Sequence, residues 1–503
     1  MTWLAVLLVA VIALVGLTVY DVVQRRHTLL RNFPVIGHLR FLLEGIGPEL
    51  RQYIVTGNDE ERPFSRDQRS WVYASAKKEN NYVGYGTDND LDASEGYVIV
   101  KQATFPLEAA AGAGDDLPCA KVLGGPRGRR LAVRPASVVN ASGMSFGSLS
   151  GPAIEAINRG SALAGCWQNT GEGGLSPYHR LGGDLVFQIG TGYFGCRDAT
   201  GRFDLSRLRD IVAENPVRAI EIKLSQGAKP GLGGVLPGAK VSPEIAAIRG
   251  VPVGITCVSP SRHSAFSDVD SLLDFVEGIA DATGLPVGIK SAVGESGFWE
   301  VLADEMARGG RAVDFINIDG GEGGTGAAPL TFSDHVSLPF RVGFARVYRL
   351  FAERDVAGDV VFAGAGRLGF PDAALFAFAL GCDLVSVGRE AMMSVGCIQA
   401  QRCHTGRCPT GVATQNRWLT RGLDPTLKSV RFANYVATLR HELLQLSLAC
   451  GVAHPALVGP DRIELLDGRY GSTTARELFA YEPGWGVPRR ADQVAVSALM
   501  RGS

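Results

Sequence analysis

Three cysteines within one short loop are the residues of this chain whose spacing points most directly to chemistry. Cys397, Cys403 and Cys408 are separated by five and four residues, and Pro409 follows the last of them. A structural zinc site usually offers paired cysteine knuckles and a fourth ligand, which this loop lacks. Soft thiolates gathered in one loop and closed by Cys-Pro are typical of an iron–sulfur cluster. The loop therefore predicts one-electron chemistry.

The number of cysteines decides which cluster is expected. Three thiolates favour a [3Fe-4S] cluster, and a [4Fe-4S] cluster with a foreign ligand such as His404 is an alternative. A second alternative is that the cysteines are small hydrophobic residues of a buried core. Arg402, His404 and Arg407 make the loop polar, however, and polar surroundings favour the cluster.

Glycine-rich loops follow several apolar runs, and 64 of the 503 residues are glycine. Such loops let the backbone approach a ligand closely. The candidate cofactor-binding residues in them are Met144, Ser145, Gly147, Gly323, Gly324, Thr325, Gly364, Gly366, Gly388 and Arg389. Segments 364–366 and 388–389 resemble the paired phosphate loops of FMN barrels, where backbone N–H groups hold a phosphate. No Gly-x-Gly-x-x-Gly motif follows an opening strand, so no Rossmann domain is expected.

Three cations could act at the same end of the fold. Lys290 ends the apolar run 286–290, where its ammonium could stabilise the anionic reduced flavin near N1 and O2. The alternative is a lysine at a strand end that reaches solvent. Lys229 and Arg249 follow another candidate strand and could hold a dicarboxylate, the arginine by a bidentate contact.

The elements that would position these residues begin near residue 137. Eight apolar runs alternate with amphipathic stretches, as an α/β fold of the (β/α)8 barrel type requires. The candidate strands are 137–141, 166–170, 185–189, 219–224, 286–289, 314–318, 360–364 and 384–387. The candidate helices are 152–163, 269–282, 298–308, 336–352, 372–380 and 427–448. The run 251–256 is a ninth candidate strand, and a doubly wound open sheet is the alternative fold.

The first residues of the chain predict a membrane helix. Residues 3–23 are apolar or neutral except for Asp21, and about 20 such residues span a bilayer. No basic residue precedes them, as one would in a cleaved signal peptide. Arg25, Arg26, His27 and Arg31 follow, so the positive-inside rule places the remaining chain in the cytoplasm. We expect a single N-terminal anchor, and a buried core helix is the alternative.

The composition of the chain limits which partners and which cellular compartment are expected. Fifty Lys+Arg against 51 Asp+Glu give a net charge of −1, so nucleic acid is not an expected partner. Nine cysteines in 503 residues do not resemble a secreted disulfide framework. The expected domains are an anchor (1–24), a lead-in region wrapping the barrel (25–136), an FMN-binding barrel (137–396), an iron–sulfur loop (397–415) and a helical tail (416–503).

The span from about residue 137 to residue 415 resembles the FMN-binding synthase domain of glutamate synthase. The matching segments are 145–147, 171–174, 221–231, 236–238, 323–327 and 397–415. The cysteine loop ending in Cys-Pro-x-Gly-Val-Ala-Thr-Gln and the stretch Gln-Gly-Ala-Lys-Pro-Gly are the most specific of them. The whole chain looks like the stand-alone, membrane-anchored members of that family.

This resemblance implies an FMN and a [3Fe-4S] cluster held by the three cysteines. It also implies a 2-oxoglutarate site near Gln226, Lys229 and Arg249, with Glu172 on the neighbouring loop and Lys290 supporting the reduced flavin. The implied reaction combines 2-oxoglutarate and ammonia to 2-iminoglutarate, whose Cα then receives a hydride from FMN. Electrons would arrive singly at the cluster from a ferredoxin-like donor or a reductase subunit.

Two departures from the family bear on function. An apolar segment stands where the full enzyme has a glutaminase domain, and the first cysteine is Cys119, so ammonia would come from solution or a separate glutaminase. Val235 stands where the family usually has glutamine, so another amino or oxo acid, such as an N-alkylated glutamate, is an alternative substrate. A membrane-tethered electron-transfer module without a small substrate is the non-enzymatic alternative.

Overall fold

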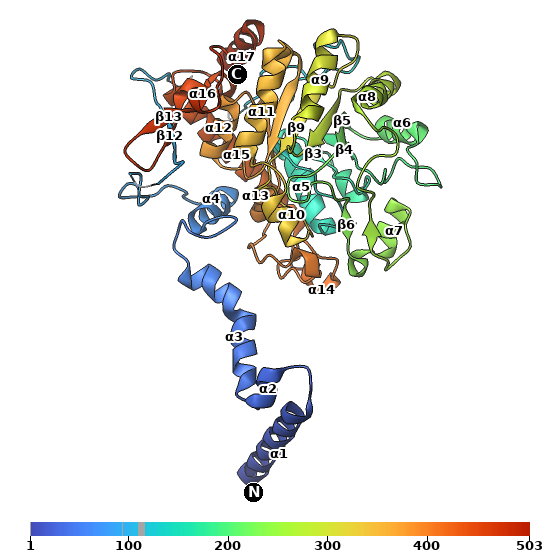
Figure 1. Cartoon of the computed structure of the whole chain (residues 1–503), viewed down its shortest axis with the longest axis vertical. Coiled ribbons are helices and arrows are strands. Elements are labelled where there is room, and N and C mark those ends of the chain that lie inside the picture. The colour runs from blue at the N-terminus through green and yellow to red at the C-terminus, as the bar shows by residue number, and fades with distance from the viewer. Residues whose placement is uncertain (1, 93, 109–115, 503) are drawn as a thin grey trace. The chain divides into compact units, whose positions relative to one another are not determined.

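The computed structural model describes residues 2–92, 94–108 and 116–502. The chain divides into two compact units, Met1–Asp67 and Gln68–Ser503, whose helices and strands are labelled in Figure 1.

The first unit is helical. Its elements are α1 (Thr2–Val23), α2 (Thr28–Asn32), α3 (Gly37–Leu50) and the π-helical turn η1 (Arg51–Val55). Residues Trp3–Val23 of α1, with a mean hydropathy of 2.6, are long and apolar enough to cross a membrane by length and composition. The carboxylate of Asp21 is buried and accepts hydrogen bonds from the Val35 N–H (2.9 Å) and from His38 Nε2 (2.9 Å). Asp21 therefore ties the end of α1 to the start of α3.

Eight parallel strands close a barrel in the second unit. Around the barrel they are β2 (Val139–Ala141), β3 (Gln168–Asn169), β4 (Leu185–Ile189), β5 (Val217–Lys223), β8 (Val287–Ser291), β9 (Phe315–Asp319), β10 (Val361–Ala365) and β11 (Leu384–Val387). The last strand pairs with the first, at Val385 and Val139. All eight predicted strands are present, so the (β/α)8 fold is confirmed and the open sheet is wrong.

The ninth candidate strand, 251–256, is wrong. This run forms turns, because Pro252 cannot donate a ladder hydrogen bond and Gly254 has a positive φ of 73°. A strand begins only after it, as β7 (Cys257–Val258), and pairs with β6 (Val235–Leu236) in a separate two-stranded sheet. This small sheet lies in the long segment between β5 and α8.

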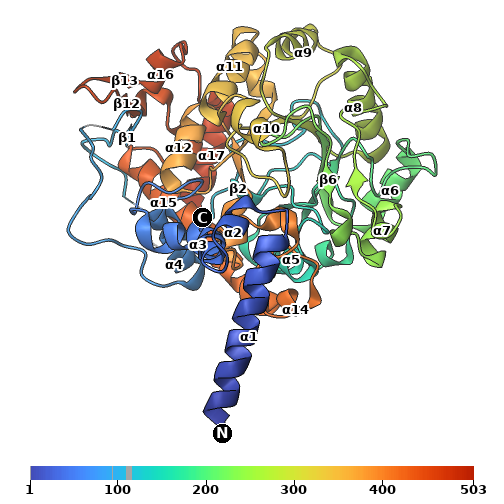
Figure 2. The ribbon, with the colours of Figure 1, turned by 60° about the horizontal axis from the view of Figure 1, so that its bottom comes forward.

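Helices separate the strands along the chain (Figures 1 and 2). They are α5 (Gly151–Ala164), α6 (Leu205–Glu214), α7 (Pro243–Arg249), α8 (Val269–Thr283), α9 (Gly297–Arg308), α10 (Leu330–His335), α11 (Phe340–Glu353), α12 (Pro371–Ala379) and α13 (Arg389–Ser394), with the 3₁₀ turns η2 (Pro177–His179), η3 (Gly238–Lys240) and η4 (Ala357–Asp359). The predicted helix 336–352 starts later than expected, at Phe340, because Pro339 precedes it and Ser337 has a positive φ of 155°.

The remaining elements lie around the barrel. They are α4 (Arg66–Lys77), η5 (Cys403–Thr405), α14 (Arg417–Thr420), α15 (Pro425–Ala449), η6 (Pro455–Leu457), η7 (Pro460–Arg462), α16 (Ala475–Leu478), α17 (Arg490–Gly502) and a sheet of β1 (Val98–Val100), β12 (Ile463–Leu466) and β13 (Ser472–Thr474). The expected helix 427–448 is confirmed as α15. It packs closely on α5 at Gly160, where a Cβ would lie only 2.5 Å from the Ser429 carbonyl oxygen.

One end of the barrel is closed by apolar side chains. They come from the starts of the strands and from the segment before β2, and they are Cys119, Leu123, Trp167, Ala219, Phe315, Val361, Ala363 and Leu384. This packing fills the amino-terminal end of the strands. The carboxyl end, where the glycine-rich loops lie, is left for polar side chains.

Candidate functional site

A buried carboxylate lies among the strands at the carboxyl end of the barrel. Glu221 on β5 is 2% exposed. It accepts hydrogen bonds from three side-chain amides on β3, β4 and β9: Asn169 (2.8 Å), Gln188 (2.6 Å) and Asn317 (2.8 Å). Burying a carboxylate is costly unless its oxygens are hydrogen-bonded, and these donors meet that requirement. The barrel therefore ends in an ordered polar layer.

Lys290 lies beside this layer and does not reach solvent. It is 6% exposed, and its Nζ is 3.5 Å from Oδ2 of Asp319 at the end of β9. Burial alone would lower the pKa of Lys290, but Asp319 and Glu221 outweigh it and hold the pKa above its usual value. The lysine is therefore a fixed cation at the mouth of the barrel.

A second cluster of polar side chains includes Lys223, the last residue of β5. Its Nζ is 3.0 Å from Oε1 of Glu172, on the loop after β3, and donates to Oε1 of Gln226 (2.9 Å). Gln226 in turn donates through Nε2 to the Gly324 carbonyl (2.9 Å) on the loop after β9. Three of the predicted site residues, Glu172, Gln226 and Gly324, are thus joined in one network.

Two further cations lie in this group, both from the segment after β5. Lys229 is 5% exposed, and its Nζ donates to the Ala327 carbonyl (3.3 Å). Burial, followed by the neighbouring Lys223, lowers the pKa of Lys229 to about 8. Arg249, at the end of α7, is 6% exposed and donates through Nη2 to Ser145 Oγ and the Phe146 carbonyl, both at 3.4 Å.

The guanidinium of Arg249 has donor capacity to spare. Its Nε is buried without a hydrogen-bond partner within the described part of the chain. Its Cζ lies 5.2 Å from the centre of the Phe194 ring. Burial lowers the pKa of Arg249, and the Cys257 thiol, which also interacts with the guanidinium, offsets part of this effect. A buried, unpaired N–H is costly, so this group suits a ligand that accepts its hydrogen bond.

Glu172 balances part of this positive charge. Burial would raise its pKa, but Lys223, with Lys229 and Arg249, outweighs burial and lowers the pKa. The carboxylate also abuts the backbone of the segment between β5 and α8, since a Cβ on Gly234 would lie 2.3 Å from its Oε1. One ionised carboxylate against three cations leaves an excess of positive charge, which fits a dianionic acid.

The predicted glycine loops lie at the same end of the barrel. Met144, Ser145 and Gly147 follow β2, and Gly323, Gly324 and Thr325 follow β9. Gly364 lies inside β10, and a Cβ there would meet the Phe340 ring at 2.7 Å, so this glycine has a packing role. Gly366 follows β10 with a φ of 127°, and Gly388 and Arg389 follow β11. The side chain of Arg389 packs against Gly324, where a Cβ would lie 2.7 Å from its Cδ.

The three loop cysteines are near one another and interact electrostatically. Burial raises the pKa of Cys397 to about 12, with a further contribution from Cys403 and Cys408. The pKa of Cys408 is lowered instead, because backbone N–H groups of its own loop outweigh the effect of burial. The Cys397 carbonyl accepts a hydrogen bond from the Tyr73 hydroxyl of α4 (2.9 Å).

Cys397, Cys403 and Cys408 carry free thiols in one loop. A structural zinc site takes four protein ligands, and this loop supplies three thiolates. Soft thiolates gathered in this way are a donor set that fits an iron–sulfur cluster.

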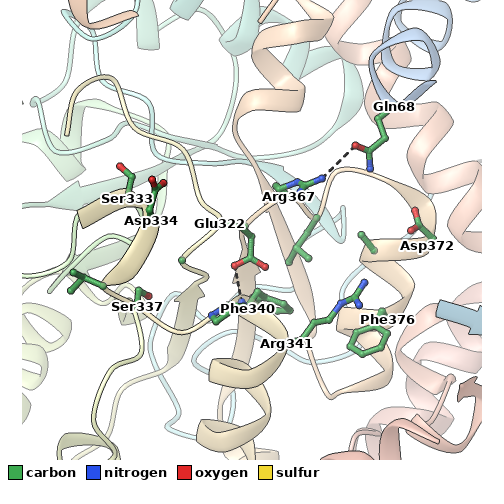
Figure 3. A pocket seen from close by; sticks show the side chains of 16 residues that line it. Gln68, Glu322, Ser333, Asp334, Ser337, Phe340, Arg341, Arg367, Asp372 and Phe376 are labelled. Carbon is green, nitrogen blue, oxygen red and sulfur yellow. Dashed lines mark hydrogen bonds between the residues drawn. The ribbon is translucent and has the colours of Figure 1, made fainter. Parts of the chain in front are cut away.

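A separate cavity of about 700 Å³ opens beside the loops after β9 and β10 (Figure 3). Glu322 in it accepts a hydrogen bond from the Phe340 N–H (2.8 Å), and the Arg341 guanidinium lies 4.5 Å from the centre of the Phe376 ring. Gly366 is the one predicted site residue in its lining. The lysines of the barrel mouth do not line it.

Several residues of the site were not predicted from the sequence. Glu221, Gln188 and Asn317 bear polar side chains inside mostly apolar strands, Asn169 belongs to the short polar strand β3, and Lys223 is the last residue of its strand. The available signal was a polar residue in a buried strand, which needs a partner and therefore predicts a cluster of polar groups.

Comparisons with known proteins identify a family. Residues 130–453 match the family described as the conserved region in glutamate synthase. The glutamate synthase large subunit-like protein YerD of Bacillus subtilis is 37% identical over 487 residues, covering 90% of this chain and 92% of YerD. The archaeal-type glutamate synthase [NADPH] of Thermotoga neapolitana is 36% identical over 342 residues, covering 67% of this chain but only 62% of that protein.

Among solved structures, a mutant flavocytochrome b2 with pyruvate bound aligns with a TM-score of 0.44 and 13% identity, covering 84% of this chain and 91% of that one. The match to the conserved region spans well over half of the chain, and YerD matches nearly all of it. The chain therefore belongs to the glutamate synthase family.

Proposed function

We propose that this chain is a glutamate synthase-like oxidoreductase that carries out the reductive amination of 2-oxoglutarate, using FMN and a [3Fe-4S] cluster. The observation that carries the proposal is the convergence of Lys223, Lys229 and Arg249 with one carboxylate, Glu172, at the mouth of a barrel. The two carboxylates of a five-carbon dicarboxylic acid would balance the excess positive charge of these four side chains. The unpaired Nε of Arg249 supports a carboxylate at this position.

The residues present fit both cofactors. Bound FMN would supply the hydride, and the cluster would pass single electrons to it. Lys290, buried and held as a cation, would support negative charge on the reduced flavin. Gly366, Gly388 and Arg389 would hold the phosphate, and Met144, Ser145, Gly147, Gly323, Gly324 and Thr325 would line the ring and ribityl chain. Cys397, Cys403 and Cys408 would ligate the cluster.

The chain's own residues bind and orient the substrate. Lys229 and Arg249 would hold the carboxylates, and Gln226 would fix the acid against the loop after β9. Ammonia adds to C2 of 2-oxoglutarate and water leaves, which gives 2-iminoglutarate. A hydride at Cα and a proton at nitrogen then give glutamate. Lys223, whose ammonium lies 3.0 Å from Glu172, would donate a proton to the leaving water.

The electron donor is proposed to be an acidic protein, either ferredoxin-like or a reductase subunit. Arg407, Arg417 and Arg421 are exposed and form no ion pair within the described residues. Trp418 is 67% exposed, with the Arg421 guanidinium 3.4 Å from its ring centre. Exposed arginine and tryptophan are typical of protein interfaces, and α14, which bears them, packs on Gly411 of the cysteine loop.

We also propose that α1 anchors the chain in a membrane and that the barrel lies in the cytoplasm. The apolar span Trp3–Val23 and the basic residues Arg25, Arg26 and Arg31 that follow it support this orientation. Ammonia would then come from cytoplasmic solution or from a separate glutaminase.

A second candidate function keeps the cofactors and replaces ammonia by an amine. Val235 of β6 is 40% exposed and follows Gly234, which touches Glu172. An apolar side chain at this place would favour an alkyl group on the attacking nitrogen, and an N-alkylglutamate would be the product.

One experiment tests the proposal. The full chain is purified anaerobically, its flavin, iron and sulfide are measured, and the reduced protein is mixed with 2-oxoglutarate and ammonium or a series of amines. We expect the flavin absorbance to return only when acid and nitrogen source are both present. Saturable perturbation of the oxidised flavin spectrum by 2-oxoglutarate excludes a pure electron-transfer module. If the protein carries all of its cofactors but no combination of acid and amine reoxidises its flavin, the enzyme assignment is refuted.

A further inference from the structure

His263 lies in the segment between β7 and α8 and contacts the last residue of β5. It is 5% exposed, and its Nε2 is 2.9 Å from the Lys223 carbonyl oxygen. Its Nδ1 is 3.1 Å from the hydroxyl of Tyr193, which follows β4 and is 1% exposed. Both ring nitrogens of this buried histidine therefore have hydrogen-bonding partners.

These partners decide which ring nitrogen carries the proton. The Tyr193 oxygen already accepts hydrogen bonds from the backbone N–H groups of Ser264 (3.0 Å) and Ala265 (3.1 Å). A hydroxyl offers two acceptor positions and one proton, so Tyr193 donates its proton to Nδ1 of His263. The Lys223 carbonyl can only accept, so the ring proton lies on Nε2. His263 is thus a neutral imidazole, in agreement with burial, which lowers its pKa.

Packing and a further hydrogen bond keep this pair in place. The His263 ring stacks on Phe266, with the ring centres 4.7 Å apart and an interplanar angle of 22°. Close to Tyr193, the Thr191 hydroxyl donates to the Pro260 carbonyl (2.7 Å), which ties the loop after β4 to the segment that carries His263. The histidine therefore contacts β5 from a rigid support.

The residue that this support holds belongs to the polar site at the barrel mouth. The Lys223 ammonium lies 3.0 Å from Glu172 and donates to Gln226 (2.9 Å). Gln226 and Lys229 follow Lys223 along the chain. The hydrogen bond from His263 to the Lys223 carbonyl therefore fixes the point at which the segment with these side chains leaves the barrel.

We propose that Tyr193 and His263 are positioning residues that hold Lys223 for proton transfer to the leaving water. This inference rests on the proposed function, because it requires Lys223 to act as the acid of that reaction. Efficient transfer needs a donor held in one geometry, and a small displacement reduces the rate strongly. The fixed tautomer of His263 provides this constraint, because only Nε2 can donate to the carbonyl.

The proton transfer balances without a further reactant. Ammonia and 2-oxoglutarate first form a carbinolamine at C2. The Lys223 ammonium gives a proton to the carbinolamine hydroxyl, the C–O bond breaks to release water, and the nitrogen lone pair forms the C=N bond. The lysine then regains a proton from solvent, and His263 keeps its own proton throughout.

A second buried histidine of the chain provides a matched control. His454 is 0% exposed, its Nε2 is 2.8 Å from the Pro118 carbonyl oxygen, and its Nδ1 accepts from the Ala456 N–H (3.1 Å). Pro118 precedes Cys119 of the apolar cluster that closes the other end of the barrel. His454 therefore repeats the hydrogen bonding of His263 at a place that has no part in the proposed reaction.

Four variants of the full chain with its cofactors test the proposal. His263→Leu removes the donor, whereas His263→Gln places an amide N–H near the same carbonyl. Tyr193→Phe allows the ring proton to move to Nδ1, and His454→Leu is the control. Calorimetry measures the dissociation constant of 2-oxoglutarate from the oxidised protein. Single-turnover kinetics in H2O and D2O measure how fast 2-oxoglutarate and ammonium reoxidise the reduced flavin.

The expected result is a slower reaction with an unchanged affinity for the acid. His263→Leu should reoxidise its flavin about 10- to 100-fold more slowly than the wild-type protein, because a misplaced acid loses much of its contribution to the rate. Its solvent deuterium isotope effect should be larger, since proton transfer then limits the rate. His263→Gln should regain most of the rate, Tyr193→Phe should be slowed, and His454→Leu should match the wild-type protein.

Three kinetic results would overturn the positioning role. They are a wild-type rate in His263→Leu, a rate in His263→Gln as low as that of His263→Leu, and an affinity for 2-oxoglutarate that falls in proportion to the rate. If His263→Leu does not fold, Tyr193→Phe decides the question by the same comparison of rate and affinity.

The tautomer can be measured without turnover. Nuclear magnetic resonance of protein labelled with nitrogen-15 histidine, assigned with His263→Gln, should show a protonated Nε2 and an unprotonated Nδ1 in His263. A proton on Nδ1 instead would contradict the proposal. If the cofactor-loaded wild-type protein is not reoxidised by 2-oxoglutarate and ammonium, the proposed function is refuted together with the acid role of Lys223. A wild-type rate in His263→Leu refutes the positioning role alone.

Discussion

Replacing Lys229 by methionine should weaken the binding of 2-oxoglutarate while leaving the fold intact. The ammonium has three donors, and the structure uses one of them, on the Ala327 carbonyl at 3.3 Å. Two donors are therefore available to a carboxylate. Lys229 forms no ion pair within the described residues, so its removal leaves no unpaired acid behind.

The expected size of the effect follows from the burial of Lys229. Its side chain is only 5% exposed, so solvent screens its charge little. A hydrogen bond to a charged group contributes about 1.5–3 kcal/mol, which corresponds to a dissociation constant about 10- to 150-fold higher in Lys229→Met. Lys229→Arg keeps the charge and should lose less.

The pH dependence gives an independent check with a defined sign. The pKa of Lys229 is lowered to about 8 in the free protein, and a bound dianion would raise it again. Above pH 8, binding must therefore take up a proton, and affinity falls as the pH rises, by about tenfold between pH 7 and pH 9. Glu172, with a lowered pKa, and Lys290, with a raised one, keep their charges over this range.

Isothermal titration calorimetry of the oxidised full chain measures both effects. Titrations in buffers of different ionisation enthalpy report the proton uptake, which should approach one proton per bound acid at pH 9 and vanish in Lys229→Met. Lys428→Met serves as the control. If Lys229→Met binds 2-oxoglutarate as tightly as the wild-type protein, Lys229 does not contact the acid. The same conclusion follows if the affinity of the wild-type protein stays constant from pH 7 to pH 9.

Three further predictions concern the cluster and the fold. Cys403→Ser should lose bound iron and sulfide but keep its flavin, and retention of the wild-type iron content would contradict the assigned ligands. Lys121→Met leaves Asp383 buried without its partner (3.0 Å), so it should destabilise the protein by about 3–5 kcal/mol, visible as a lower melting temperature. Gly160→Val should cost about 1–3 kcal/mol because its Cβ would meet the Ser429 carbonyl at 2.5 Å, whereas Gly278→Val, with no atom within 4 Å of the added Cβ, should cost less.

The barrel could be predicted because its strands are short apolar runs bounded by helices and glycine loops. Most residues of these strands are buried on both faces, which makes most of the runs apolar and easy to recognise. The run 251–256 misled the prediction because hydrophobicity alone does not register Pro252 and the positive φ of Gly254. The start of α11 was misplaced for a similar reason, since Pro339 sets the boundary and the apolar pattern does not.

The site was only partly predictable. Glu172, Gln226, Lys229 and Arg249 stand out because they lie in the segments that follow strands, where a barrel places its active site. Glu221 lies inside a strand, and its three amide partners come from β3, β4 and β9, so their convergence depends on the closed sheet.

The central claim is that the cations at the barrel mouth hold 2-oxoglutarate for reduction to an amino acid. The most direct measurement incubates the anaerobic, cofactor-loaded chain with a low-potential reductant, carbon-13-labelled 2-oxoglutarate and nitrogen-15-labelled ammonium, and identifies the product by nuclear magnetic resonance. We predict glutamate that carries both labels, formed by the wild-type chain and at a much lower rate by Lys229→Met. The account would be contradicted if the chain carries all of its cofactors but forms neither doubly labelled glutamate nor, when amines are supplied, a labelled N-alkylglutamate.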